Sequence, residues 1–302
     1  MKIQIDPEQD SFLLYHVVDR APLLPTVMQL DLVARGLTAM TAAQPTGPPS
    51  AGLLLRGIRV GPPVQFAVTG PHHLDLLGGP DPTSRHGRSA ARFELRSAGC
   101  AEPHLTADAE HVSEPAGRLL PASGWADGLP GGPDLIYPPF FHGPAFQVVG
   151  AFGRTADRGL AARLAPGLPP LRWGREPTVL QPRLLELLLQ CCGIQELAGT
   201  GRMMVPAAIE SVHWRPESLV PGAETSAVAV VRPRPRQSRV FDGQVVAPGG
   251  TVLLTVTGYQ ATDLGCPANL KHAARLIRCL DSQPEPAAHP KAGTTFLQGA
   301  PR

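Results

Sequence analysis

The sequence has few aromatic and few charged residues, and it contains no long apolar run. Aromatic side chains make up 5% of the 302 residues and charged side chains 17%, whereas 43% of the residues are hydrophobic. Nowhere do about 18 apolar residues follow one another, as a membrane-spanning helix requires, and residues 1–16 lack the apolar core of a signal peptide. We therefore expect a soluble cytoplasmic protein without a membrane partner.

An excess of charge and a metal-binding motif are also missing. The 27 basic and 25 acidic side chains leave a net charge of +2, so no global field favours nucleic acid as a partner. The five cysteines include no CxxC pair, which excludes the common zinc and redox motifs. His72 and His73 would point to opposite faces of a strand, and no further ligands flank them. We therefore expect no metal site.

Proline and glycine are abundant instead. The chain has 35 prolines and 32 glycines, which indicate short strands, many turns and long loops rather than a helical bundle. The length suits two domains of about 150 residues each.

The first half of the chain begins with one helix and continues with strands. Residues 24–36 carry apolar positions at helical spacing, with Pro25 in the first turn and Gly36 as the stop signal. Residues 113–136 are rich in turn-forming residues and have no periodicity, so we predict the boundary between two units there. Between the helix and this boundary, strand-like runs lie at 52–60, 64–70, 90–98 and 102–112.

The second half repeats this order. Two units of one helix and several strands predict a duplicated α+β fold, with halves at 1–125 and 126–265. The extension, 266–302, is predicted to form one short amphipathic helix over 269–283 before a tail whose composition is typical of disorder. The helix of the second unit is predicted over 181–198, and its strand-like runs lie at 146–155, 159–166, 209–214, 225–233, 238–248 and 251–261.

Three polar side chains stand out in otherwise apolar segments. His16 lies in the strand-like run HVVDRAPLLP, where a histidine is usually a core or rim residue. Glu186 lies within a run of leucines on the predicted helix, and Gln190 follows one turn later on the same face. Burial would raise the pKa of the Glu186 carboxyl and keep it protonated, as a general acid must be, unless a partner stabilises the anion. Alternatively, Glu186 points to solvent.

The surroundings of these side chains resemble two motifs of one enzyme family. His16, Arg20 and Pro25 stand at the spacing of the HxxxGxxxxP motif of polyketide synthase dehydratase domains. The segment QPRLLELLLQ, which contains Glu186 and Gln190, resembles the HPxxLDxxxQ motif of the same domains.

Two further segments resemble the same family and lie in the expected order. HGPAFQ (142–147) resembles the end of the GYxYGPxF motif. MMVPAAIESVHW (203–214) resembles the segment that enters the strand after the catalytic helix. Together the four markers make the chain similar to polyketide synthase dehydratase domains over residues 10–263. Their combination in this order is more specific than any single marker.

The resemblance implies a double hot-dog fold and a reaction. In this fold two long helices are each wrapped by an antiparallel sheet, and the active site lies between the halves. His16 would be the base that removes the α-proton of a β-hydroxyacyl thioester. Glu186 would take the place of the family's aspartate as the acid that protonates the leaving β-hydroxyl, so that an α,β-enoyl thioester forms. The resemblance implies no metal or organic cofactor. It implies an acyl carrier protein as partner, and analogy with the family predicts a homodimer.

The same resemblance gives roles to the neighbouring residues. The backbone N–H of Thr26, after Pro25, would face the thioester carbonyl at the start of a helix. Gly143 and Phe146 would line the acyl tunnel. Gln190 would orient Glu186 or the departing water through a hydrogen bond.

Several positions depart from the family pattern, among them Thr26, where many relatives have a glycine, and Phe140, which replaces a tyrosine. Glu186 replaces aspartate, Arg20 replaces the glycine of the first motif, and His142 replaces a tyrosine of the third. Arg20 would place a bulky cation at the substrate site, and Tyr137 is the nearby candidate for the missing phenol. The departures at Arg20, Glu186 and His142 favour an alternative, in which the same catalytic residues carry out a double-bond shift, pyran formation or polyketone ring closure. A further alternative is a non-catalytic module that binds an acyl carrier or a polyketide.

A cluster of arginines offers a second kind of surface. Arg232, Arg234, Arg236 and Arg239 alternate with prolines in VRPRPRQSR, which is typical of an exposed hairpin or sheet edge whose charges discourage pairing. The alternative is a docking site for an acidic acyl carrier protein. The start of the chain, MKIQIDPEQDSF, favours a free-standing protein over an excised domain.

Overall fold

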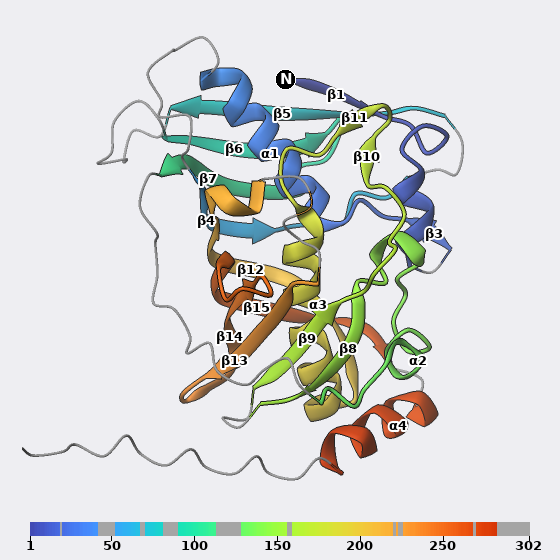
Figure 1. The fold of residues 1–302 in the computed structure, drawn as a ribbon. Helices are drawn as coiled ribbons and strands as arrows, with labels where there is room; N and C mark the ends of the chain where they lie inside the picture. Colours follow the sequence, from blue (N-terminus) through green and yellow to red (C-terminus); the bar gives the residue numbers. More distant parts are fainter. Residues whose placement is uncertain are drawn as a thin grey trace, which may run out of the picture.

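The computed structural model describes residues 1–18, 20–41, 52–66, 70–80, 90–112, 128–155, 159–219, 222, 226–267 and 270–282. Two helices lie against one large antiparallel sheet, and each helix belongs to one half of the chain (Figure 1). None of the helices in these ranges has both the length and the apolar character needed to cross a bilayer.

The first half wraps five strands around α1 (Thr26–Thr41). Apolar residues dominate the buried face of α1 and the strand faces opposite it, so burial of apolar surface holds this half together. In spatial order the strands are β1 (Lys2–Ile5), β5 (His72–Pro80), β6 (Ala90–Ser97), β7 (Leu105–Val112) and β4 (Gly52–Val60).

The second half wraps six strands around α3 (Pro182–Thr200). This helix is buried on nearly all sides in its first three turns, which agrees with its continuous run of leucines. In spatial order the strands are β12 (Arg202–Trp214), β15 (Val252–Pro267), β14 (Gln237–Val246), β13 (Val228–Arg234), β9 (Leu160–Leu164) and β8 (Val149–Arg154).

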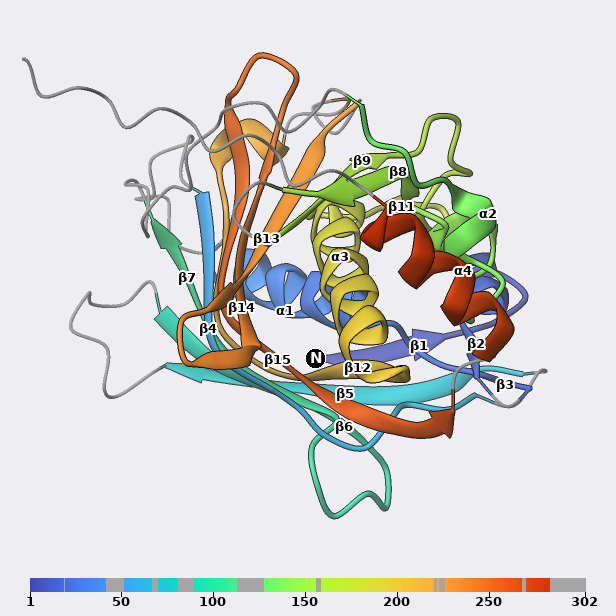
Figure 2. The same ribbon diagram turned by 90° about the horizontal axis from the view of Figure 1, so that it is seen from below.

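The two halves share one sheet because β4 pairs with β12. Their antiparallel register runs from Ala208 opposite Arg59 to Trp214 opposite Leu53. The resulting eleven-stranded sheet curves around both helices, and α1 and α3 contact each other inside it (Figure 2). This is the arrangement expected of a double hot-dog fold.

A short hairpin of the second half is tied to α1. It consists of β10 (Arg172–Trp173) and β11 (Glu176–Pro177). The carboxylate of Asp31, which is fully buried, accepts hydrogen bonds from Trp173 Nε1 at 2.8 Å, from the Leu180 backbone N–H at 2.7 Å and from Arg35 Nε at 3.2 Å. Since Leu180 lies just before α3, Asp31 fixes the position of α3 against α1.

The helix predicted over 24–36 is longer in the structure, because Gly36 does not end it. α1 continues to Thr41, and Gly36 is buried inside it. A Cβ atom at Gly36 would lie 2.7 Å from Leu76 Cδ2 and 2.8 Å from Phe93 Cε1. The glycine therefore serves close packing of the helix on β5 and β6, not termination.

The strand predicted over 64–70 is wrong in the part that the structure describes. Residues 64–66 form only one isolated bridge, between Gln65 and Leu23, and 67–69 lie outside the described residues. The backbone groups bond to the segment before α1 instead, since Leu24 N–H donates to the Val64 carbonyl and Phe66 N–H to the Pro22 carbonyl. This segment therefore supports the loop that leads to α1.

Most of the other predicted elements are confirmed to within about three residues, with helices and strands of the expected kind. Two strands are longer than predicted, since β12 begins seven residues before 209–214 and β15 ends six residues after 251–261, and β1 and β5 were not predicted. The end of the chain adds α4 (Leu270–Asp281) near the predicted 269–283, and it buries Ala273, Leu276 and Leu280 against α2 (Pro133–Ile136) and α3. The first part of the predicted boundary, 113–127, and the tail, 283–302, lie outside the described residues, so the division at 125 stays a prediction. The short elements are η1 (Ser11–Tyr15), β2 (Val17–Val18), β3 (Ala21–Pro22), η2 (Pro144–Phe146) and η3 (Pro216–Leu219).

The arginine cluster does form a hairpin, between β13 and β14. Arg234 is not free for docking, because it bonds to Asp242 at 3.0 Å and to Glu210 at 2.7–2.8 Å. Arg236 lies at the turn and is exposed, as is Arg239.

Candidate active site

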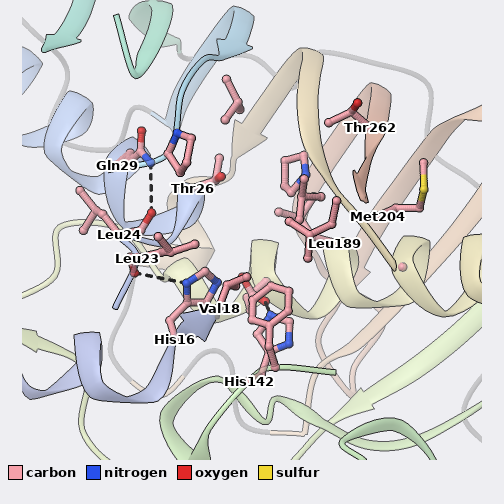
Figure 3. A pocket seen from close by; sticks show the side chains of 18 of the residues that line it. His16, Val18, Leu23, Leu24, Thr26, Gln29, His142, Leu189, Met204 and Thr262 are labelled. Atoms are coloured by element: carbon pink, nitrogen blue, oxygen red, sulfur yellow. Dashed lines mark hydrogen bonds and ion pairs between the residues drawn. The ribbon is translucent and has the colours of Figure 1, made fainter. Parts of the chain in front are cut away.

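His16 lies between η1 and β2, and one contact fixes its ring. Its Nδ1 atom is 3.2 Å from the backbone carbonyl oxygen of Leu23 (Figure 3). A carbonyl can only accept, so Nδ1 carries the proton of the neutral ring and Nε2 keeps a free lone pair. Burial, together with the nearby His142, lowers the pKa of His16 to about 4, although Glu186 acts in the opposite direction. His16 is therefore an unprotonated base at neutral pH.

Glu186 lies in the second turn of α3 and points into the protein, so the solvent-exposed alternative is wrong. Its side chain is 6% exposed. The Oε1 atom lies 3.1 Å from His142 Nε2 and accepts a hydrogen bond from Gln190 Nε2 at 2.7 Å. Glu186, His142 and Gln190 thus form one buried polar cluster.

A chain of hydrogen bonds sets the orientation of Gln190. The Val149 backbone N–H donates to the Tyr137 hydroxyl at 2.7 Å, so this hydroxyl donates its own proton to Gln190 Oε1 at 3.0 Å. The amide nitrogen of Gln190 then donates to the Phe146 carbonyl and to Glu186 Oε1, both at 2.7 Å. Tyr137 therefore acts on Gln190 and does not supply a phenol to the pocket.

This cluster changes the expected state of Glu186. Burial is the largest single cause and raises the pKa of its carboxyl, but the hydrogen bond and charge of His142, together with His16 and Gln190, outweigh it. The pKa therefore lies below its ordinary value. Unlike the expectation from the leucine-rich surroundings alone, the Glu186 side chain is held as a carboxylate beside His142.

The base and the carboxylate cluster meet at the junction of the two halves. The rings of His16 and His142 lie 5.5 Å apart between centroids, and their backbones form an isolated bridge. The side chains of both histidines lie on the same wall of the pocket, and the Leu23 contact holds Nδ1 of His16 away from His142 (Figure 3). His16 comes from the first half, whereas His142 and Glu186 come from the second.

A pocket of about 540 Å³ adjoins these groups. Its walls include Thr26 and Gln29 of α1 as well as Leu189 and Gly193 of α3, and most of the remaining lining is apolar. A concave, largely apolar pocket with a few convergent polar groups is typical of a small-molecule site. Among the described residues no group of three or more His, Cys, Asp or Glu side chains is arranged to hold a metal ion.

Four further residues from the motifs hold the site's frame or line its wall. Thr26 begins α1 and lines the pocket, and the carbonyl of Pro25 accepts the first helical hydrogen bonds. The Gly143 backbone N–H donates to the Tyr15 carbonyl at 2.7 Å, and a Cβ atom at Gly143 would lie 2.9 Å from Tyr15 Cα. Phe146 is fully buried beneath the His16 ring rather than in the pocket wall.

The structure does not bring Arg20 into the site. Its side chain is exposed and is not part of the pocket lining. Its φ angle is +66°, in the left-handed region that favours glycine. The backbone at this position is therefore of a kind that favours glycine, and this chain adopts it with an exposed arginine outside the pocket lining.

Two buried polar residues of the pocket wall escaped the sequence analysis. Gln29 lies in the first turns of α1, and its Oε1 atom has no hydrogen-bond partner among the described residues. Tyr259 lies on β15 and is also part of the wall. Neither belongs to a motif, and only the folded chain places them beside Glu186 and His16.

Comparisons with known proteins find similarity both in sequence, to a protein family, and in fold, to solved structures. A scan against protein families matches residues 138–270 to the family described as "Polyketide synthase dehydratase N-terminal domain". No curated protein matches the sequence.

Solved structures match nearly the whole chain. A dehydratase domain of a trans-AT polyketide synthase from Brevibacillus brevis is 19% identical, with a TM-score of 0.68 over 87% of this chain and 93% of that chain. The dehydratase domain of PpsC from Mycobacterium tuberculosis, solved with C12:1-CoA, is 20% identical, with a TM-score of 0.61 over 87% and 92%. The dehydratase domain from the CurF module of the curacin polyketide synthase is 13% identical, with a TM-score of 0.66 over 87% and 92%.

These identities are low, so the structural matches establish the fold, while the family match concerns the sequence of the second half. The fold is the double hot-dog of polyketide synthase dehydratase domains, and the resemblance to that family inferred from the four sequence markers is confirmed.

Proposed function

We propose that this protein removes water from a β-hydroxyacyl thioester in polyketide biosynthesis, as a hydro-lyase. The observation that carries the proposal is the juxtaposition of an unprotonated His16 with the Glu186–His142 pair beside one apolar pocket. The family match and the double hot-dog fold support a dehydratase role.

His16 is the base in this proposal. The thioester carbonyl acidifies the α-carbon, and His16 Nε2 accepts the α-proton. The electron pair of the broken C–H bond then forms the double bond between the α- and β-carbons. The contact of Nδ1 with Leu23 suits this role, because it keeps Nε2 free and stabilises the imidazolium that results.

The acid is the Glu186–His142 pair rather than Glu186 alone. The lowered pKa of Glu186 means that burial by itself does not retain a proton on the carboxyl. In this proposal the proton of the contact between His142 Nε2 and Glu186 Oε1 passes to the β-hydroxyl as the C–O bond breaks, so that water leaves. Gln190 keeps the carboxylate in place through its hydrogen bond to Oε1.

The start of α1 supplies the remaining group. Thr26 lies at the N-terminus of this helix and lines the pocket, so its backbone N–H can stabilise the thioester oxygen as negative charge develops there. The substrate in this proposal is bound to the phosphopantetheine arm of an acyl carrier protein.

One observation favours a second candidate function. A carboxylate held ionised beside His142 can also accept a proton, which double-bond migration or ring closure requires. An isomerase or cyclase acting on a related thioester is therefore the second candidate.

The test uses the purified protein and a β-hydroxyacyl N-acetylcysteamine thioester, analysed by mass spectrometry and chromatography. Loss of the mass of one water supports dehydration. An unchanged mass with a new retention time supports the isomerase or cyclase. No change in either, together with measurable binding, would reject both enzyme proposals in favour of a binding module.

A further inference from the structure

Tyr259 places a hydroxyl group without a partner at the pocket wall. Its side chain is 2% exposed and belongs to the lining of the pocket. Among the described residues, none forms a hydrogen bond with this hydroxyl, whereas the hydroxyl of Tyr137 forms two. The hydroxyl is not among the sealed buried atoms without a partner, so it borders the cavity, and its partner has to come from what occupies the pocket.

A bulge in β15 turns this tyrosine inward. In the pairing with β14, Gly243 lies opposite Val256 and Phe241 opposite Tyr259, so three steps along β15 match two along β14. Because the bulge adds one residue to β15, Tyr259 returns to the side of Val256 although three positions separate them, and both belong to the same hydrophobic core.

Gly258 makes the bulge possible. Its φ angle is +63°, and its N–H donates to Asp242 Oδ1 at 2.8 Å instead of to the sheet. A Cβ atom at this position would lie 2.2 Å from Glu210 Cδ. The inward position of Tyr259 therefore depends on Gly258, which a residue with a side chain cannot replace without strain.

The pocket that Tyr259 lines runs along α3 and is largely apolar. Leu189 and Gly193 follow Glu186 along one face of α3 at intervals of three and seven residues, and Met204 and Leu264 line the same cavity. Seven residues of helix span about 10 Å, enough for several carbon atoms beyond the reacting centre. Burial raises the pKa of Tyr259, which keeps its phenol protonated and able to donate.

We propose that the Tyr259 hydroxyl donates a hydrogen bond to an oxygen atom on the acyl chain beyond the β-carbon. The substrate class is then a keto- or hydroxy-substituted polyketide acyl chain rather than a saturated fatty acyl chain. This inference rests on the proposed function and adds a specificity-determining residue to it.

The test compares two thioesters of equal length with wild-type protein and Tyr259→Phe. One is a β-hydroxyacyl N-acetylcysteamine thioester with a saturated tail, and the other carries an additional δ-keto group. We expect wild type to prefer the δ-keto substrate in kcat/KM, and Tyr259→Phe to reduce this preference about tenfold, the worth of one hydrogen bond. The melting temperature of the free protein should not fall, since the hydroxyl has no protein partner to lose.

Tyr137→Phe is the matched control. It removes a phenol that bonds to Gln190 and to the Val149 backbone, so it should lower the melting temperature and slow both substrates by the same factor. The inference is overturned if wild type converts both thioesters with the same kcat/KM. It is also overturned if Tyr259→Phe lowers kcat/KM equally for both, or if this variant has a lower melting temperature than wild type.

A failure of the proposed function would look different. If wild type removes water from neither thioester, dissociation constants for the two compounds still test the inference. Tighter binding of the δ-keto compound to wild type, lost in Tyr259→Phe, would support the tyrosine's role, and equal binding would overturn it.

Discussion

At His16, a single backbone contact and the desolvation of the ring determine the protonation state that the proposed reaction needs. Because Nδ1 bonds to Leu23 and burial disfavours the imidazolium, the ring is neutral well below the pH at which an ordinary histidine becomes charged. The motif made His16 a candidate, but the sequence could not show this state, since the partners lie at Leu23, His142 and Glu186.

The pH dependence of the reaction follows from this state. The pKa of His16 is lowered from 6.5 to about 4, so the base remains unprotonated as the pH falls through 6.5 and is lost only near pH 4. We expect the acid limb of kcat/KM to have its midpoint near pH 4, because kcat/KM reports the free protein. Steady-state rates in a series of buffers measure it, and a midpoint near 6.5 would contradict the account.

Arg20 gives a second test at the scale of one residue. Its φ of +66° costs a side-chain-bearing residue about 1–2 kcal/mol, while glycine loses about 0.5–1 kcal/mol more backbone entropy on folding. Arg20→Gly should therefore stabilise the protein by about 0.5–1 kcal/mol, and Arg20→Ala should not. Chemical denaturation measures both, and both variants should retain wild-type turnover. A large loss of turnover in Arg20→Ala would instead indicate a substrate contact.

The carboxylate cluster shows what a motif can and cannot predict. The spacing of Glu186 and Gln190 gave their shared helix face, and the structure places them in contact. The role of Tyr137 through Gln190, and the pairing of His142 with Glu186, depend on a loop that lies some forty residues before α3. Local pattern carries no information on such contacts, so the lowered pKa of Glu186 could not be foreseen.

At the scale of elements, periodicity predicted the helices and most strands because their buried faces repeat regularly. It failed at residues 64–66, where two preceding prolines lack the N–H groups of a sheet ladder and the backbone bonds to the loop before α1. It also misread Gly36, whose meaning depends on Phe93, a residue more than fifty positions away.

Gly36→Ala separates helix propensity from packing. Propensity alone predicts a gain of about 1 kcal/mol inside a helix. The added methyl group would meet Leu76 and Phe93 below 3 Å, so we expect a net loss of about 1–3 kcal/mol in the free energy of unfolding. Thermal or urea denaturation measures the change. A more stable variant would show that β5 and β6 adjust freely to α1.

At the scale of the whole molecule, the site exists only where the two halves meet. His16 and Thr26 come from one half and Glu186 from the other, and the halves are joined by the β4–β12 pair and by the hydrogen bonds of Asp31. The duplicated α+β plan could be predicted from the repeated order of elements. The role of Asp31 could not, because its partners, Trp173 and Leu180, lie some 140 residues away.

Asp31→Asn tests this connection. Asparagine offers one acceptor oxygen where the carboxylate offers two, so one of the buried donors at Trp173 and Leu180 loses its partner. We expect a loss of about 2–3 kcal/mol in the free energy of unfolding at neutral pH, and reduced turnover as the halves shift. A variant of wild-type stability and activity would show that the hairpin does not hold the halves together.

The proposed reaction depends on His16 and the Glu186–His142 pair acting together to remove water from a β-hydroxyacyl thioester. The most direct measurement is the initial rate of enoyl thioester formation by wild type, His16→Gln and Glu186→Gln, with melting temperatures recorded for each. We expect enoyl product with wild type and a fall in the initial rate of about 10²-fold or more in both variants, without loss of the fold. Formation of the enoyl thioester at the wild-type rate by either variant would contradict the proposal.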